Sequence, residues 1–120
     1  MTLKETIAMV EAFHNAFGIE NRHKPTAELS KAQQELRYRL MAEENDEYLE
    51  AVKNNDLVEI ADALGDQLYI LCGTILKHGL QDKIAAVFKE IQRSNMSKLD
   101  ADGKPIYRAD GKVMKSDLYF

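Results

Sequence analysis

Two stretches of acidic residues carry side chains whose types and spacing could do chemistry. Residues 41–50 read MAEENDEYLE, and residues 59–66 read EIADALGD. In a helix that turns 100° per residue, Glu43 and Glu47 continue an apolar stripe, and Glu44 lies at its edge. The apolar members of that stripe are Leu36, Leu40 and Ala51. Carboxylates therefore occupy positions where a core-facing helix normally carries apolar side chains.

The acids of the second stretch also share one face of a helix. Glu59, Asp62 and Asp66 are spaced i, i+3 and i+7, and residues 57–76 contain no other charged side chain. A short Asn-Asn-Asp connection at residues 54–56 would make the two helices antiparallel neighbours. We therefore expect the two sets of acids to meet.

Bases nearby in the sequence cannot neutralise these acids. From Glu43 to Asp66 there are nine acidic residues and one basic residue, Lys53. Two carboxylates about 5 Å apart repel each other by about 3 kcal/mol at an effective dielectric constant of about 20. Hard divalent cations take oxygen ligands, and Mg²⁺ binds a few carboxylates while it recruits substrate phosphates. The pattern predicts a Mg²⁺ site, with Mn²⁺ as the other candidate, between the two helices.

A solvated acidic face is the alternative interpretation. Asp56 and Glu59 also fit the capping of a helix N-terminus, and Glu44, Asp46 and Glu50 could face water. The two interpretations differ in whether the carboxylates of the two helices converge.

Two other kinds of metal site fit poorly. A di-iron bundle needs paired Glu-x-x-His motifs on separate helices, whereas the chain has Glu20-x-x-His23 in an expected loop. A calcium loop needs acids at positions 1, 3 and 5 and glycine at 6, and Asp100, Asp102 and Gly103 do not have that spacing.

Helix start and stop signals define the elements that must position the acids. Three pairs of residues have capping-box spacing: Thr2 with Glu5, Ser30 with Gln33, and Asp56 with Glu59. Together with the apolar periodicity they predict helices at about 2–17, 30–53 and 56–79. A fourth helix is expected from Asp82, as its cap, to Asn95 or one turn later.

The C-terminal segment changes character. Two Asp-Gly pairs, at 102–103 and 110–111, bracket short alternating pieces and predict a hairpin of residues 105–108 and 112–115. The expected fold class is all-α: a four-helix bundle with a short C-terminal hairpin or extended tail. We expect a helical domain at 1–99 and a tail at 100–120 that packs on the bundle or on a partner chain.

Composition and charge exclude several classes of function. A net charge of −4 and a pI near 5.4 argue against binding to a nucleic-acid duplex, which needs a basic face. The longest apolar run, 68–72, is far shorter than the ~20 residues of a membrane span. The single cysteine, Cys72, lies within that run and predicts a buried structural thiol and a cytoplasmic protein.

The acidic motif resembles that of a known family. Glu43-Glu44-x-x-Glu47 followed by Glu59-x-x-Asp62 is similar to the EExxE…ExxD signature of the MazG-like all-α nucleoside triphosphate pyrophosphohydrolases, which include phosphoribosyl-ATP pyrophosphohydrolase. The resemblance extends over about residues 36–99, and FKEIQRSNMSKLDADGKPIYR is similar to the C-terminal stretch of MazG-like proteins. It implies a four-helix MazG-like bundle that self-associates as a dimer or tetramer.

The resemblance also implies an activity and a set of site residues. The activity is metal-dependent cleavage of a nucleoside triphosphate between the α and β phosphates, giving a monophosphate and pyrophosphate. The implied metal ligands are Glu43, Glu47, Glu59 and Asp62. Glu44 is implied as a further ligand or as the catalytic base that orients water. Asp66 offers an alternative acid one turn further on, so which of Glu59, Asp62 and Asp66 bind metal stays open.

Substrate-binding residues are expected outside the acidic cluster. Arg93, Asn95 and Lys98 lie at the end of the fourth helix, at a place that similar proteins use for substrate, although the two cations also suit a helix C-terminus. Tyr69 could stack on a base or belong to the core. The same choice applies to three further residues: Phe13, His14 and Phe17.

A noncatalytic module is the rival function. A dimeric helical bundle with a binding or regulatory role would use its acids for solubility. Alanine at Glu43 and Glu47 would then leave stability unchanged or raise it, with or without Mg²⁺. The third helix is apolar nearly all round, which predicts self-association under either function.

Overall fold

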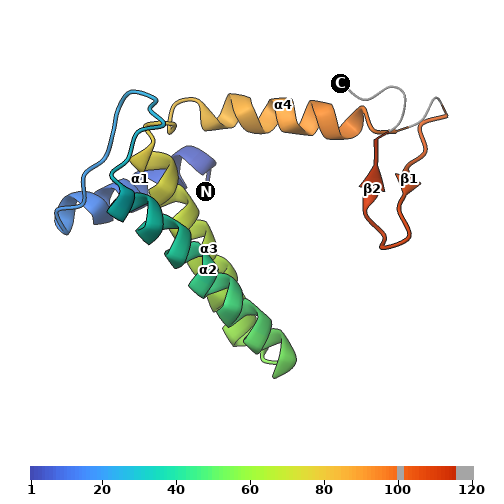
Figure 1. The fold of residues 1–120 in the computed structure, drawn as a ribbon, viewed down its shortest axis with the longest axis horizontal. Helices are drawn as coiled ribbons and strands as arrows, with labels where there is room; N and C mark the ends of the chain where they lie inside the picture. Colours follow the sequence, from blue (N-terminus) through green and yellow to red (C-terminus); the bar gives the residue numbers. More distant parts are fainter. Residues whose placement is uncertain (100–101, 116–120) are drawn as a thin grey trace. The chain divides into compact units, whose positions relative to one another are not determined.

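The chain folds as an all-α protein, as the sequence predicts. A computed structural model describes residues 1–99 and 102–115. In this part of the chain there are four helices and one two-stranded hairpin (Figure 1). The elements are α1 (Leu3–Ala16), α2 (Lys31–Lys53), α3 (Leu57–Lys77), α4 (Ile84–Met96), β1 (Ile106–Tyr107) and β2 (Val113–Met114).

Local capping explains where the first three helices begin. The side chains of Thr2, Ser30 and Asp56 each accept a hydrogen bond from the backbone N–H three residues later. These caps satisfy backbone donors that a helix leaves free in its first turn. The predicted caps of α1, α2 and α3 are confirmed.

Helix α4 begins differently from the prediction. Its N-cap is Lys83, which makes no side-chain capping hydrogen bond. The expected cap by Asp82 is therefore wrong, because the helix begins one residue too late for the Asp82 side chain to occupy the capping position.

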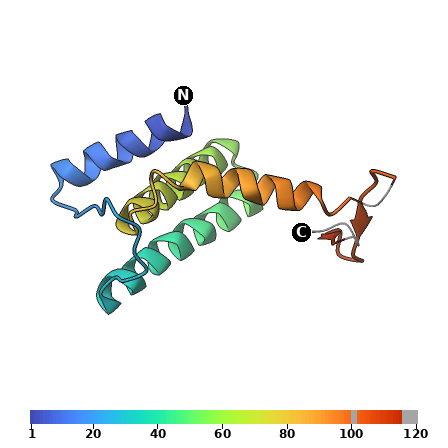
Figure 2. The same ribbon diagram turned by 90° about the horizontal axis from the view of Figure 1, so that it is seen from above.

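Helices α2 and α3 form an antiparallel pair that lies side by side in both views (Figures 1 and 2). The connection is tight: Asn55 takes a positive φ of 52°, and Asp56 N–H donates to the carbonyl oxygen of Ala51 at 3.0 Å. Helix α1 contacts α3. The buried apolar core lies among these three helices and consists of Ile7, Val10, Ala51, Ala63, Cys72, Ile75 and Leu76.

The chain divides into two compact units, Met1–Asp82 and Lys83–Phe120. The first holds α1, α2 and α3. The second holds α4 and the hairpin, in which Ile106 pairs with Met114 and Tyr107 with Val113. The predicted hairpin is confirmed, with shorter strands. The domain boundary at 99/100 and the packing of the tail on the bundle or a partner stay predictions.

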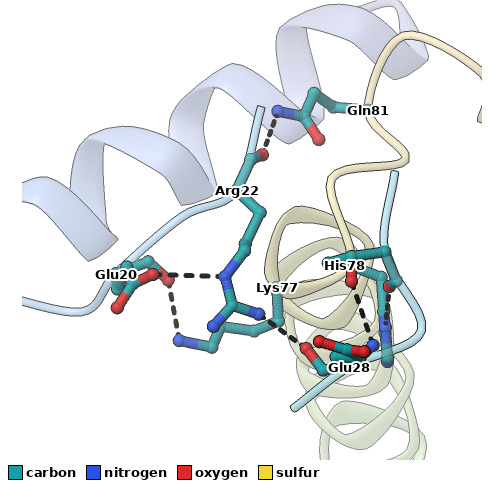
Figure 3. Close-up of polar contacts among 7 residues, drawn as sticks. Glu20, Arg22, Glu28, Lys77, His78 and Gln81 are labelled. Atoms are coloured by element: carbon teal, nitrogen blue, oxygen red, sulfur yellow. Dashed lines mark hydrogen bonds and ion pairs between the residues drawn. The ribbon is translucent and has the colours of Figure 1, made fainter. Parts of the chain in front are cut away.

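The segment between α1 and α2 is held against the end of α3 (Figure 3). Lys77 Nζ donates to the Glu20 carbonyl oxygen at 2.7 Å, and Gln81 Nε2 donates to the Arg22 carbonyl oxygen at 2.7 Å. Gly79 has a φ of 65° and lies so close to Lys24 that a Cβ there would overlap the Lys24 carbonyl. Side chains from the end of α3 and the residues after it thus hold the backbone of this segment, which forms neither helix nor strand.

Candidate metal centre

Three carboxylates of α2 and α3 converge across the seam between the helices. Among the described residues, Glu44, Glu47 and Asp66 form the one group of three acids, histidines or cysteines whose ligand atoms all lie within 4.8 Å of one another. Glu44 and Glu47 are one turn apart on α2, and the antiparallel pairing brings Asp66 of α3 opposite them. The predicted meeting of the two sets of acids is therefore observed.

The inward face of α2 keeps the predicted Leu36, Leu40 and Ala51 but includes Arg37 and Glu44 beside the predicted stripe. Arg37 and Ala51 are buried and Glu44 is half-buried, whereas Glu43 is exposed. The side chain of Glu43 is 58% exposed and forms an ion pair with Arg39 at 3.9 Å. Glu44, expected at the edge of the stripe, thus lies nearer its centre than Glu43 does.

The electrostatics of the cluster show the cost of bringing these acids together. Burial raises the pKa of Glu44 to about 7, and the neighbouring carboxylate of Glu47 contributes to the rise. Burial likewise raises the pKa of Asp66, with a further contribution from the negative charge of Asp62. Without a counter-charge, Glu44 is therefore partly protonated at neutral pH.

One carboxylate oxygen of the cluster has no partner and is available to a ligand. Glu44 Oε2 is buried and has no hydrogen-bond partner. A buried, unpartnered carboxylate oxygen costs free energy unless a proton or a cation joins it. The donor set is made only of carboxylate oxygens, which suits a hard cation such as Mg²⁺ or Mn²⁺ better than a soft metal. The residues present therefore fit a divalent cation.

The remaining acids of α3 lie towards the turn. Glu47, Glu59 and Asp62 line a groove of about 240 Å³ at the end of the α2–α3 pair. Glu59 is also the residue whose N–H donates to the Asp56 cap, which fixes its backbone. Glu47 thus belongs both to this groove and to the cluster with Glu44 and Asp66. Five of the six predicted ligands follow one seam, and Glu43 points elsewhere.

The predicted substrate residues are divided between the two compact units. Arg93, Asn95 and Lys98 belong to the second unit, where Arg93 Nη2 pairs with Glu90 Oε1 at 2.6 Å. Tyr69 belongs to the first unit and packs edge-on against Phe13, with ring centroids 5.6 Å apart. All four stay predicted substrate residues.

A buried basic cluster was missed by reasoning from the sequence. Arg37, Lys77 and His14 are 9%, 5% and 3% exposed. A Cβ at Gly73 would lie 2.6 Å from Arg37 Nη2 and 3.0 Å from His14 Nε2, so the cluster presses on the backbone of α3. The available signals were an arginine directly after Leu36 of the apolar stripe and a lysine one turn after Gly73 on the most apolar helix.

Comparison with known families identifies the family of the chain and agrees with its all-α fold. Residues 10–95, from α1 to the end of α4, match the model of the phosphoribosyl-ATP pyrophosphohydrolase family. The chain belongs to this family, which is part of the MazG-like all-α nucleoside triphosphate pyrophosphohydrolases, so the predicted resemblance is confirmed. Membership implies a pyrophosphohydrolase that acts on a nucleotide. No curated protein matches the chain significantly.

None of the helices in the part of the chain that the structure describes combines the length and apolar character that a membrane crossing requires.

Proposed function

We propose that the protein is a Mg²⁺-dependent nucleoside triphosphate pyrophosphohydrolase that cleaves between the α and β phosphates. The observation that carries the proposal is the convergence of Glu44, Glu47 and Asp66, with ligand atoms within 4.8 Å of one another and a buried oxygen of Glu44 without a partner. Mn²⁺ would suit the same oxygen ligands. The products are a nucleoside monophosphate and pyrophosphate.

The residues of the seam have separate roles in this proposal. Glu47 and Asp66 hold the cation, together with Glu59 and Asp62 from the turn end of the groove. The cation, when bound, neutralises charge on phosphate oxygens and makes water more acidic. Glu43 is not among the proposed ligands of the cation, because its side chain is exposed and forms an ion pair with Arg39.

Glu44 is the proposed base. In the metal-free chain, burial and the neighbouring carboxylates raise the pKa of Glu44 to about 7. A cation held by Glu47 and Asp66 would lower that pKa again, so that Glu44 is ionised and can accept a proton from water. The water oxygen forms the new bond to phosphorus, the phosphoanhydride bond between the α and β phosphates breaks with pyrophosphate as the leaving group, and the proton passes to Glu44.

The substrate is a nucleotide with a triphosphate chain. The name of the family suggests phosphoribosyl-ATP, which contains the same anhydride bond, as one candidate. Arg93, Asn95 and Lys98 are proposed to bind phosphate oxygens, and Tyr69 to contact the base. Phe13 packs edge-on against Tyr69, and the two rings together offer an aromatic surface that a base could contact.

Self-association accompanies the proposal. Leu57 and Val58 are each 77% exposed, and three further leucines of α3 are about half exposed. A soluble monomer rarely presents so much apolar surface on one helix, so we infer a homodimer or homotetramer. Cys72 is a free, buried thiol, as predicted, and supports the inferred cytoplasmic location.

Product analysis tests the chemistry. Each nucleoside and deoxynucleoside triphosphate, and phosphoribosyl-ATP, would be incubated with protein and Mg²⁺ and followed by ³¹P NMR. The proposal expects monophosphate and pyrophosphate in equal amounts. Diphosphate and inorganic phosphate would contradict cleavage between α and β, and the absence of any product would favour a noncatalytic module.

A further inference from the structure

The buried side chains of Arg37 and Lys77, beside the segment between α1 and α2, carry positive charges but donate hydrogen bonds only to uncharged acceptors among the described residues. Arg37 donates from Nε to Thr74 Oγ1 at 3.0 Å and from Nη2 to the Ile70 carbonyl oxygen at 2.8 Å. Lys77 donates to the carbonyl oxygen of Glu20 at 2.7 Å. In the described part of the chain, neither Arg37 nor Lys77 forms an ion pair within 4.0 Å.

Such an arrangement is costly without an anion. A buried charge that has only neutral hydrogen-bond partners loses roughly several kcal/mol of hydration free energy. A nearby opposite charge would offset part of this loss. Burial lowers the pKa of Lys77, and the positive charges of Arg22 and Arg37 lower it further against the opposing effect of Glu20. Burial also lowers the pKa of Arg37.

These cations border a cavity. A pocket of about 520 Å³ is lined by Arg22, Arg37 and Lys77, and its one acidic lining residue is Glu20. Glu20 pairs with Arg22 at 3.2 Å, so its charge is already engaged. The polar lining is completed by Ser30 and Gln33 at the start of α2. Figure 3 shows Arg22 between Glu20 and Glu28, with Lys77 below it.

We propose that this pocket, bordered by Arg22, Arg37 and Lys77, binds a phosphate-type oxyanion. Two or more negative charges would compensate the excess positive charge of the lining, and arginine and lysine both bind phosphate oxygens well. The cavity has room for pyrophosphate or for the phosphate of a nucleotide as well as for inorganic phosphate.

The pocket is distinct from the acidic seam. Arg37 and Glu44 are two helical turns apart on α2, which corresponds to roughly 10 Å along the axis. Oxyanion binding here needs no metal and does not depend on the proposed hydrolysis. Failure of one proposal therefore leaves the other standing.

Calorimetry of the intact protein in EDTA tests the site, with inorganic phosphate, pyrophosphate and AMP as the three probes. The wild type is expected to bind at least one probe saturably, and Lys77→Met to raise its dissociation constant at least tenfold. Arg39→Gln is the matched control: it removes an exposed arginine of α2 outside the pocket and should change the constant less than twofold. Tighter binding of AMP than of phosphate would identify a nucleotide as the source of the oxyanion.

Two results would overturn the proposal. One is equal affinity of the wild type and Lys77→Met for the probes. The other is the absence of saturable binding of any probe up to about 10 mM. Thermal stability distinguishes a binding role of Lys77 from a purely structural one. If the role is purely structural, Lys77→Met lowers Tm equally with and without phosphate. The oxyanion site instead predicts that phosphate raises Tm in the wild type and not in the variant.

A second variant covers the case in which Lys77→Met does not fold. The Arg22 side chain is 34% exposed, so Arg22→Gln should be tolerated. It is expected to weaken oxyanion binding severalfold. An unchanged dissociation constant in Arg22→Gln would count against the proposal.

Discussion

Glu44 of α2 and Asp66 of α3 place carboxylate oxygens within 4.8 Å of each other across the helix seam. Like charges at this separation repel by a few kcal/mol, roughly, at an effective dielectric constant of about 20. The metal-free protein relieves part of this repulsion because burial and the neighbouring acids raise the pKa of Glu44 to about 7, so that Glu44 is partly protonated near neutral pH. A cation bound at the seam would remove this repulsion and stabilise the helix pair.

The metal-free protein should be less stable at neutral than at mildly acidic pH. The pKa of Glu44 is about 7 in the folded chain and 4.5 is its usual value. Between these values the folded state holds a proton that the unfolded state has lost, so the free energy of unfolding falls as pH rises from about 4.5 to about 7. Urea unfolding in EDTA across this range measures the slope.

Glu44→Gln supplies the comparison for that slope. The variant lacks the titrating carboxyl, so its stability should change less with pH over the same interval. An identical slope in the variant would mean that other groups dominate the pH dependence.

Metal binding should depend on the seam and not on acidic charge in general. Glu47→Gln removes the residue shared by the cluster and the groove, and should weaken Mn²⁺ binding at least tenfold. Asp46→Asn removes one negative charge from an exposed position of α2 and should change the affinity less than threefold. Titration followed by electron paramagnetic resonance of free Mn²⁺ measures both. Equal losses in the two variants would indicate diffuse attraction.

Gly79 should resist substitution because of its backbone. Alanine there would adopt a positive φ and overlap the Lys24 carbonyl, so Gly79→Ala should lower the free energy of unfolding by about 2–4 kcal/mol. Gly65→Ala, in the middle of α3 with open space around its Cα, should instead raise it by about 0.5–1 kcal/mol. Chemical denaturation compares the two, and a stable Gly79→Ala would refute the close contact.

A stripe along α3 should mediate self-association. Leu57, Leu64, Leu68 and Leu71 recur at helical spacing and are 77%, 48%, 47% and 47% exposed. Light scattering after gel filtration should give a dimer or tetramer for the wild type and a smaller species for Leu68→Glu. A wild-type monomer at micromolar concentration would remove this prediction.

Sequence patterns predicted the elements well where the cause is local. Capping by Thr2, Ser30 and Asp56 depends on residues three positions apart, and the Asp-Gly pair at 110–111 specifies its own turn. The predicted cap of α4, Asp82, lies one residue before the observed N-cap, Lys83. Helix starts are commonly uncertain by one or two residues.

The orientation of the acids on α2 was harder to predict because it depends on tertiary partners. The predicted stripe through Leu36 and Glu43 did not include Arg37. Arg37 is buried, since Ile70 and Thr74 of α3 accept its hydrogen bonds. Glu44 lies about two turns after Arg37 on the same side of α2, which favours Glu44 over Glu43 at the seam. Both residues belong to the family motif, so the motif alone could not choose between them.

Pyrophosphate release as a function of Mg²⁺ tests the central claim most directly. Pyrophosphate measured directly in quenched samples by ion chromatography should show a saturable dependence on Mg²⁺ in the wild type and no release in EDTA. Glu44→Gln should lower kcat at least a hundredfold, whereas the control Asp46→Asn should retain most of the wild-type kcat. Pyrophosphate release that persists in EDTA, or that survives Glu44→Gln unchanged, would contradict a metal-dependent hydrolase built on the α2–α3 seam.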